Sequence, residues 1–132
     1  MEVLSLVSTV YGILLGAVVA LTPPTHPDPP PFVEPVKMRV TCYLPTGNPT
    51  CTGVMPFEGG CAAKREWVGC VAVVYTEDMQ YVGCFDINDT GGHKRIKSGA
   101  SIDIYRNSME RARSWVREYG DYMYVQIIPC DG

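Results

Sequence analysis

The sequence predicts a small, mostly β domain in which a closed sheet carries one packed helix. Several segments alternate apolar and polar residues with a period of two, the pattern of strands that bury one face. These segments do not alternate with helical patterns, as a parallel α/β sheet would require. Only one segment has the spacing of an amphipathic helix, and closure of the sheet would leave no strand edge exposed.

Length and charge limit the class of protein. The chain has 132 residues, enough for one domain with a core, and its 46% hydrophobic content excludes intrinsic disorder. Residues 36–132 contain all eleven Lys and Arg and eleven of the fourteen acidic residues, so this part is formally neutral. A neutral domain does not attract a charged polymer over long distances, and we therefore expect no nucleic-acid partner.

The N-terminal part is predicted to be a targeting segment and a linker. Residues 1–21 include an uncharged stretch about as long as a bilayer core is thick, which indicates a hydrophobic helix. This helix would be a cleaved signal peptide or an uncleaved transmembrane anchor that contacts the membrane, and the structural alternative is a buried core helix of the domain. Residues 22–35 include seven prolines, which exclude a helix and predict an extended linker. The globular domain is then residues 36–132.

All six cysteines follow the linker, at positions 42, 51, 61, 70, 84 and 130. An even number in a small domain is typical of exported proteins braced by disulfides, and a hairpin could place Cys70 opposite Cys84. We therefore expect an exported protein, extracellular or in the cell envelope, although free thiols in a cytosolic domain are the alternative. The chain has no C-x-x-C pair, so no zinc site is expected.

At least five strands are predicted in the domain, over residues 36–44, 69–76, 81–88, 101–105 and 122–128. The second and third form a hairpin, because residues 77–80 read as a turn.

A helix is predicted between the last two strands. Asn107 and Glu110 have the spacing of a capping box, and Gly120 supplies a stop. Five apolar residues share one face of this helix: Met109, Ala112, Trp115, Val116 and Tyr119. The opposite face carries Arg111, Arg113 and Arg117, which we interpret as a solvated surface.

Aspartates near the third and fourth strands are the candidates for chemistry. Asp86 and Asp89 lie near the end of the third strand, and Asp89 begins a turn in which its carboxylate can accept backbone N–H bonds. Asp103 lies between two isoleucines, so its carboxyl group points to the opposite face of the strand. In an enclosed groove, burial and a nearby carboxylate would raise the pKa of Asp103. A protonated acid beside an ionised one can cleave a glycosidic bond, whereas the structural alternative is that both groups only form internal hydrogen bonds.

Two adjacent strings carry a family resemblance. Residues 85–92 read Phe-Asp-Ile-Asn-Asp-Thr-Gly-Gly, and residues 96–105 read Ile-Lys-Ser-Gly-Ala-Ser-Ile-Asp-Ile-Tyr. They resemble the signature of the 3D (Asp-Asp-Asp) domain family, an Asp-Thr-Gly-Gly turn followed by an Ile-Lys-Gly segment and an Ile-Asp strand. Weaker similarities at residues 41–43, 51–53 and 122–128 extend the resemblance over about residues 38–128.

The resemblance implies a six-stranded double-psi β-barrel, the fold of the catalytic domain of lytic transglycosylases and of expansin-like wall-loosening modules. It implies that Asp103 is the general acid and that Asp89 supports it. The sequence departs from the family at Lys64, which replaces the first of the three aspartates, and at an insertion over residues 93–95. The residues expected to bind substrate around this pair are Thr41, Tyr43, Asp86, Thr90, Gly91, Gly92 and Tyr105.

The function that these observations predict is cleavage of peptidoglycan glycan strands by a monomeric lytic transglycosylase-like enzyme. Asp103 would act as acid and then as base between N-acetylmuramic acid and N-acetylglucosamine, without a metal or organic cofactor. The second hypothesis is a non-catalytic module of the same fold that binds wall carbohydrate or loosens the wall. A third is a disulfide-braced surface protein or phage-encoded accessory protein.

Overall fold

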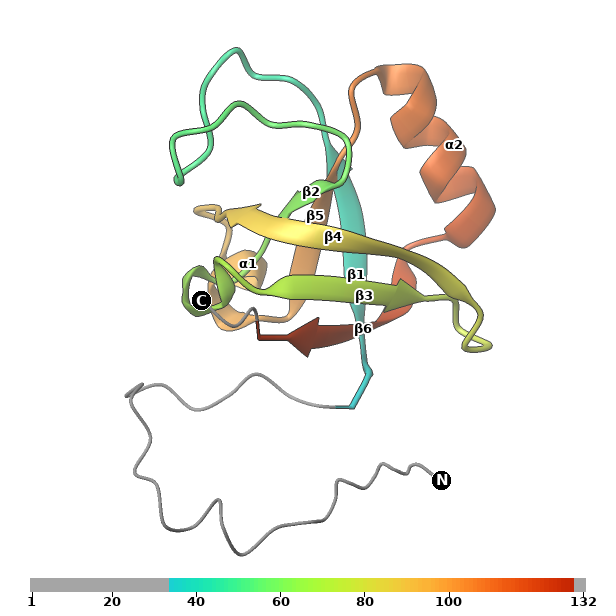
Figure 1. Cartoon of the computed structure of the whole chain (residues 1–132). Helices are drawn as coiled ribbons and strands as arrows, with labels where there is room; N and C mark the ends of the chain where they lie inside the picture. Colours follow the sequence, from blue (N-terminus) through green and yellow to red (C-terminus); the bar gives the residue numbers. More distant parts are fainter. Residues whose placement is uncertain (1–33, 130–132) are drawn as a thin grey trace, which may run out of the picture.

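The structure is a computed structural model that describes residues 34–129. These residues form a closed barrel with the strand order β1-β5-β2-β4-β3-β6, and helix α2 (Met109–Tyr119) lies along its outside (Figure 1). The strands are β1 (Val36–Tyr43), β2 (Gly60–Ala62), β3 (Val71–Tyr75), β4 (Tyr81–Asp89), β5 (Ser101–Tyr105) and β6 (Tyr122–Ile128). The predicted mainly β fold, with a closed sheet and one main helix, is confirmed.

The barrel is mixed. β1 pairs with β5 in parallel, as β2 does with β4, and the other neighbouring strands are antiparallel. β2 lies between β4 and β5 and pairs with both. It is only three residues long and all three are buried, so its sequence shows no alternation of apolar and polar residues.

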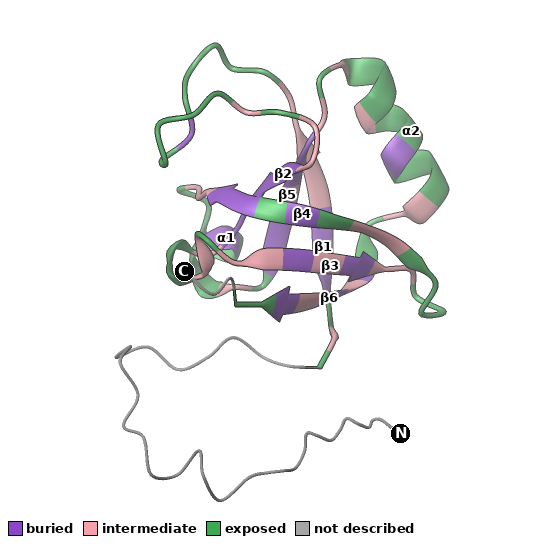
Figure 2. Cartoon of the chain, viewed as in Figure 1, coloured by how far each residue is buried: buried purple, intermediate pink, exposed green. Residues whose placement is uncertain are grey.

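The barrel interior is filled by apolar side chains from all six strands. Most of the buried residues lie on the strands around the barrel, as Figure 2 shows. Fully buried examples are Val40, Ile102, Ile104, Val125 and Ile127. Because Ile102 and Ile104 point inward, Asp103 between them points out of the barrel, which is the orientation that the alternation predicts.

Helix α2 contributes one side chain to this core. Trp115 is 6% exposed and packs edge to face on Phe85 and Tyr119, with ring centroids 5.8 and 4.8 Å away. The rest of the predicted apolar face is less buried, because Met109 and Val116 remain 51% and 42% exposed.

The helix begins one residue later than the capping-box spacing predicts. Ser108 is the N-cap, and its hydroxyl accepts the Arg111 N–H at 3.2 Å. The backbone N–H of Asn107, the residue before the cap, donates to Glu58 Oε2 at 2.6 Å.

A second helix, α1 (Lys94–Ser98), was not predicted. His93 caps its N-terminus, and Gly99 ends it in the left-handed conformation with φ of 82°. A 3-10 turn, η2 (Arg65–Trp67), precedes β3.

The predicted disulfide framework is wrong for the described residues. No disulfide joins any two cysteines in the range 34–129, and Cys42, Cys51, Cys61 and Cys84 are free thiols. The register places Val73, not Cys70, opposite Cys84. Cys42 and Cys61 lie on either side of Ile104, two strand spacings or roughly 10 Å apart, which is too far for a disulfide. Cys130 lies outside the described residues.

The predicted N-terminal segment at residues 1–21 and nearly all of the linker also lie outside the described residues. Between residues 34 and 129, no helix has the length and apolar character needed to span a bilayer.

We expect Gly99→Ala to destabilise the fold by about 1–3 kcal/mol. Besides the strain of a positive φ, a Cβ at this position would approach Trp67 Cη2 to 2.9 Å. Urea unfolding compares this variant with Gly92→Ala, since a Cβ at Gly92 would meet no atom within 4 Å. Equal stability of the two variants would contradict the prediction.

Candidate functional site

A pocket of about 280 Å³ lies against the outside of the barrel wall, where β5, β2 and β4 meet. The loop between β1 and β2 covers one side, and the turn that leads into α1 covers the other. The lining residues are Tyr43, Thr46, Asn48, Pro49, Pro56, Ala62, Asp89, Thr90, Gly91, Gly92, His93, Ile96 and Asp103.

The strand register brings Asp89 and Asp103 to this pocket. Asp103 on β5 is paired with Ala62 on β2, and Ala62 is in turn paired with Asp89 on β4. The two aspartate Cα atoms are therefore separated by two strand spacings, roughly 10 Å. The residue between them has only a methyl side chain, which leaves space for a ligand between the carboxyl groups.

The carboxyl group of Asp103 is partly buried and has one described hydrogen bond. Thr41, its neighbour on β1, donates from Oγ1 to Asp103 Oδ1 at 2.8 Å. Burial raises the pKa of Asp103, and the bond from Thr41 opposes this effect without cancelling it. Asp103 thus keeps its proton to a higher pH than a solvated aspartate.

Asp89 is held by the backbone. Its Oδ1 accepts the Thr90 N–H at 2.8 Å and the Cys51 N–H at 3.0 Å. The second bond ties the loop between β1 and β2 to β4, while Asp89 Oδ2 receives no described hydrogen bond and remains for a ligand.

Tyr43 supplies an unused hydrogen-bond donor. Its hydroxyl is buried and has no hydrogen-bond partner among residues 34–129, and its ring packs on Tyr105 with centroids 5.3 Å apart. Burial and the charges of Asp89 and Asp103 raise the pKa of this phenol, so it stays protonated at neutral pH. A protonated hydroxyl without a partner can donate to an oxygen atom of a ligand.

We expect Tyr43→Phe to raise the thermal midpoint of the free protein by several degrees. A buried polar group without a partner costs about 1–3 kcal/mol, and 1 kcal/mol corresponds to about 4–8 °C in a domain of this size. Tyr75→Phe is the matched control, because the Tyr75 hydroxyl donates to Gln126 Oε1 at 3.0 Å and its loss should lower the midpoint. A lower midpoint for Tyr43→Phe would show that its hydroxyl stabilises the fold instead.

Of the other residues that the sequence analysis expected to bind substrate, some line the pocket and some lie beside it. Thr90, Gly91 and Gly92 line the pocket. Thr41 lies behind Asp103 and orients it, and Tyr105 lies buried behind Tyr43. Neither of them lines the pocket.

Asp86 and Lys64 also lie outside the lining of this pocket. Asp86 is exposed on β4, where its neighbours in register are Gly60 and Val71. Lys64 Nζ lies 5.8 Å from the ring centroid of Trp67. Lys64 therefore displaces neither carboxyl group of the pocket.

Sequence reasoning missed two contributions to the pocket. The first is His93, which entered the sequence analysis only as part of the insertion over residues 93–95. The second is the loop between β1 and β2, which contributes Thr46, Asn48, Pro49 and Pro56. The loop has no periodic pattern, and its bonds from Cys51 to Asp89 and to the Asn88 carbonyl reveal that it folds over β4.

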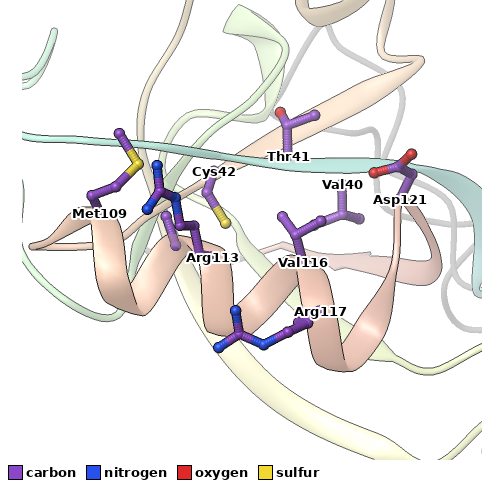
Figure 3. A pocket seen from close by; sticks show the side chains of 9 residues that line it. Val40, Thr41, Cys42, Met109, Arg113, Val116, Arg117 and Asp121 are labelled. Atoms are coloured by element: carbon purple, nitrogen blue, oxygen red, sulfur yellow. The ribbon is translucent and has the colours of Figure 1, made fainter.

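A second hollow, of about 520 Å³, lies between β1 and α2. Its apolar part includes Val40, Cys42 and Val116, and Arg113 and Arg117 stand along the helix (Figure 3). Burial raises the pKa of the Cys42 thiol to about 11, so the thiol stays protonated. This hollow has no pair of carboxyl groups and is less suited to acid–base chemistry.

The two hollows use opposite sides of β1. In Figure 3, Thr41 points away from the side chains of Val40 and Cys42. The alternation of the strand thus places the Thr41 hydroxyl on the side of Asp103, to which it donates, and the side chains of Val40 and Cys42 on the side of α2.

Comparisons of the chain with models of known protein families, with characterised proteins and with solved structures give no match.

Proposed function

We propose that this protein is a lytic transglycosylase-like enzyme of the 3D domain type, in which Asp103 is the general acid. The observation that carries the proposal is the pairing in one pocket of Asp103, whose pKa is raised by burial, with the backbone-held Asp89. The six-stranded mixed barrel is compatible with double-psi topology, since it contains two parallel strand pairs, β1 with β5 and β2 with β4.

In the proposed reaction, Asp103 donates its proton to the oxygen between N-acetylmuramic acid and N-acetylglucosamine as the C1–O bond breaks. The 6-hydroxyl of the muramyl ring then attacks C1, and the Asp103 carboxylate takes the hydroxyl proton. The product is a 1,6-anhydro sugar, and no water is consumed. The Asp103 proton is restored, so one acid serves both steps.

Asp89 would stabilise the positive charge that develops at C1. It lies across Ala62 from Asp103, and one of its oxygens is already fixed by two N–H groups. A carboxylate held in this way needs no reorganisation as the charge forms. The Tyr43 hydroxyl is the corresponding donor for a sugar oxygen.

The second candidate function is binding of wall glycan without cleavage. The pocket favours it in one respect, because β2 contributes Ala62 to the lining and no third carboxyl group. The carboxyl groups of Asp89 and Asp103 and the Tyr43 hydroxyl would still bind sugar hydroxyl groups.

Incubation of the full chain with purified peptidoglycan tests both functions. Soluble 1,6-anhydromuropeptides, detected by mass spectrometry, are the expected result. Products with hydrated reducing ends would show hydrolysis instead of transglycosylation. Sedimentation of the protein with the wall, with no release of fragments, would support the binding module. Absence of both release and sedimentation would overturn both proposals.

A further inference from the structure

The pocket contains a histidine whose ring is held by the start of α1. His93 is the N-cap of this helix, and its Nδ1 accepts the backbone N–H of Arg95 at 3.1 Å. His93 also lines the pocket together with Asp89 and Asp103. One side chain thus contacts both the helix and the candidate site.

The cap selects one neutral tautomer of His93. An acceptor nitrogen in a neutral imidazole cannot carry the proton, so the hydrogen must lie on Nε2. The structure gives no hydrogen bond for Nε2 within residues 34–129. The ring therefore offers a donor in a fixed orientation.

This donor complements the other polar groups of the pocket. Ionised Asp89 can only accept hydrogen bonds, and it suits the hydroxyl groups of a sugar. The carbonyl oxygens of acylamino groups and the oxygens of carboxylates need donors instead, and the unpaired Tyr43 hydroxyl supplies one of them.

We infer that His93 is a substrate-binding residue that donates from Nε2 to an acceptor oxygen of the glycan. This inference rests on the proposed function and adds a specificity-determining contact to it. Because the contact is made with the bound substrate and does not change during bond cleavage, it should affect KM and leave kcat nearly unchanged.

The test separates this contact from the capping role. Asn is among the best N-cap residues and its carbonyl can accept the Arg95 N–H, but it has no group equivalent to Nε2–H. His93→Asn should keep the thermal midpoint within about 2 °C of wild type. His93→Ala, which removes cap and donor, should lower it further.

Kinetics of the full chain on peptide-free glycan strands then measure the contact. We expect His93→Asn to raise KM about tenfold, the effect of losing one hydrogen bond to a ligand, with kcat within about twofold of wild type. Lys94→Ala, an exposed change at the next residue, is the control and should leave both constants unchanged. If wild type binds the strands without cleaving them, the same comparison is made on Kd.

Nitrogen-15 NMR of the imidazole supplies a readout that does not depend on turnover. The expected spectrum has a protonated Nε2 and an unprotonated Nδ1, and the Nε2–H signal should shift when glycan strands are added. A dominant Nδ1–H tautomer, or a His93→Asn variant with wild-type KM and Kd, would overturn the inference. Wild-type protein that neither cleaves nor binds the strands would instead overturn the proposed function, and with it the inference.

Discussion

Asp103→Asn is expected to reduce glycan cleavage by about 100- to 10 000-fold, the range for loss of a general acid. The substitution conserves shape, and the amide oxygen of Asn can still accept the 2.8 Å hydrogen bond from Thr41. Only the transferable proton is lost. The rate of release of anhydromuropeptides measures the effect, and sedimentation with peptidoglycan should remain unchanged.

The matched control is Asp86→Asn, the same change at an exposed aspartate of β4 that does not line the pocket. It should retain the wild-type rate. If both variants lost cleavage activity equally, the loss would come from removal of any carboxyl group and not from the particular role of Asp103. Residual activity of Asp103→Asn near that of wild type would remove Asp103 from the mechanism.

Asp103 also makes stability depend on pH in a defined direction. Its pKa is raised by folding, so the folded protein holds the proton more tightly than the unfolded chain. As pH rises from about 4, the unfolded chain loses this proton first, and wild type becomes less stable relative to Asp103→Asn. The difference between the thermal midpoints of wild type and Asp103→Asn should stop growing above the pKa that Asp103 has in the folded protein. The rate of cleavage should fall through that same pKa, because the acid must be protonated.

Asp89→Ala is expected to have the second largest effect, a loss of roughly 100-fold or more in cleavage. The change removes the charge beside C1 and also the acceptor for the Cys51 N–H, which holds the loop that covers the pocket. Loss of the loop contact should raise KM, whereas loss of the charge should lower kcat.

Asp89→Asn separates these two contributions. Its amide oxygen can still accept both backbone N–H groups, so the loop should stay in place and KM should remain near wild type while kcat falls. Protection of the Cys51 amide from hydrogen exchange reports the loop directly, and it should be lost in Asp89→Ala only. If the Cys51 amide also lost its protection in Asp89→Asn, a neutral amide oxygen at position 89 would not be sufficient to hold the loop.

The strands could be predicted from the sequence because most of them bury one face. The predicted ranges 101–105 and 122–128 coincide with β5 and β6, and the ends of the others differ by one or two residues. β2 was not assigned, because three residues that are all buried give no period. α1 is only five residues long and carries a single buried apolar residue, Ile96, which is too little for a helical pattern.

The sequence predicts single residues of the candidate site and the direction in which they point, but not how these residues are arranged relative to one another. Alternation predicted that Asp103 faces away from the interior, and the glycine turn predicted that Asp89 accepts backbone N–H bonds. The order of strands around the barrel cannot be read from local patterns, and that order places Ala62 between the two aspartates. His93 was missed for the same reason, since its place in the pocket depends on how α1 packs against β5.

A row of four residues in register, one each from β1, β5, β2 and β4, crosses the candidate site in the order Thr41, Asp103, Ala62 and Asp89. These residues come from distant parts of the chain. The Thr41 to Asp103 bond spans 62 positions, and the Cys51 to Asp89 bond spans 38. Such contacts have high contact order, so the loop-closure entropy of bringing these segments together must be overcome before any of them forms. After dilution from denaturant, cleavage activity should therefore return late, in a single phase together with closure of the barrel. A proteolytic fragment that lacks β1, β2, β4 or β5 should have no cleavage activity.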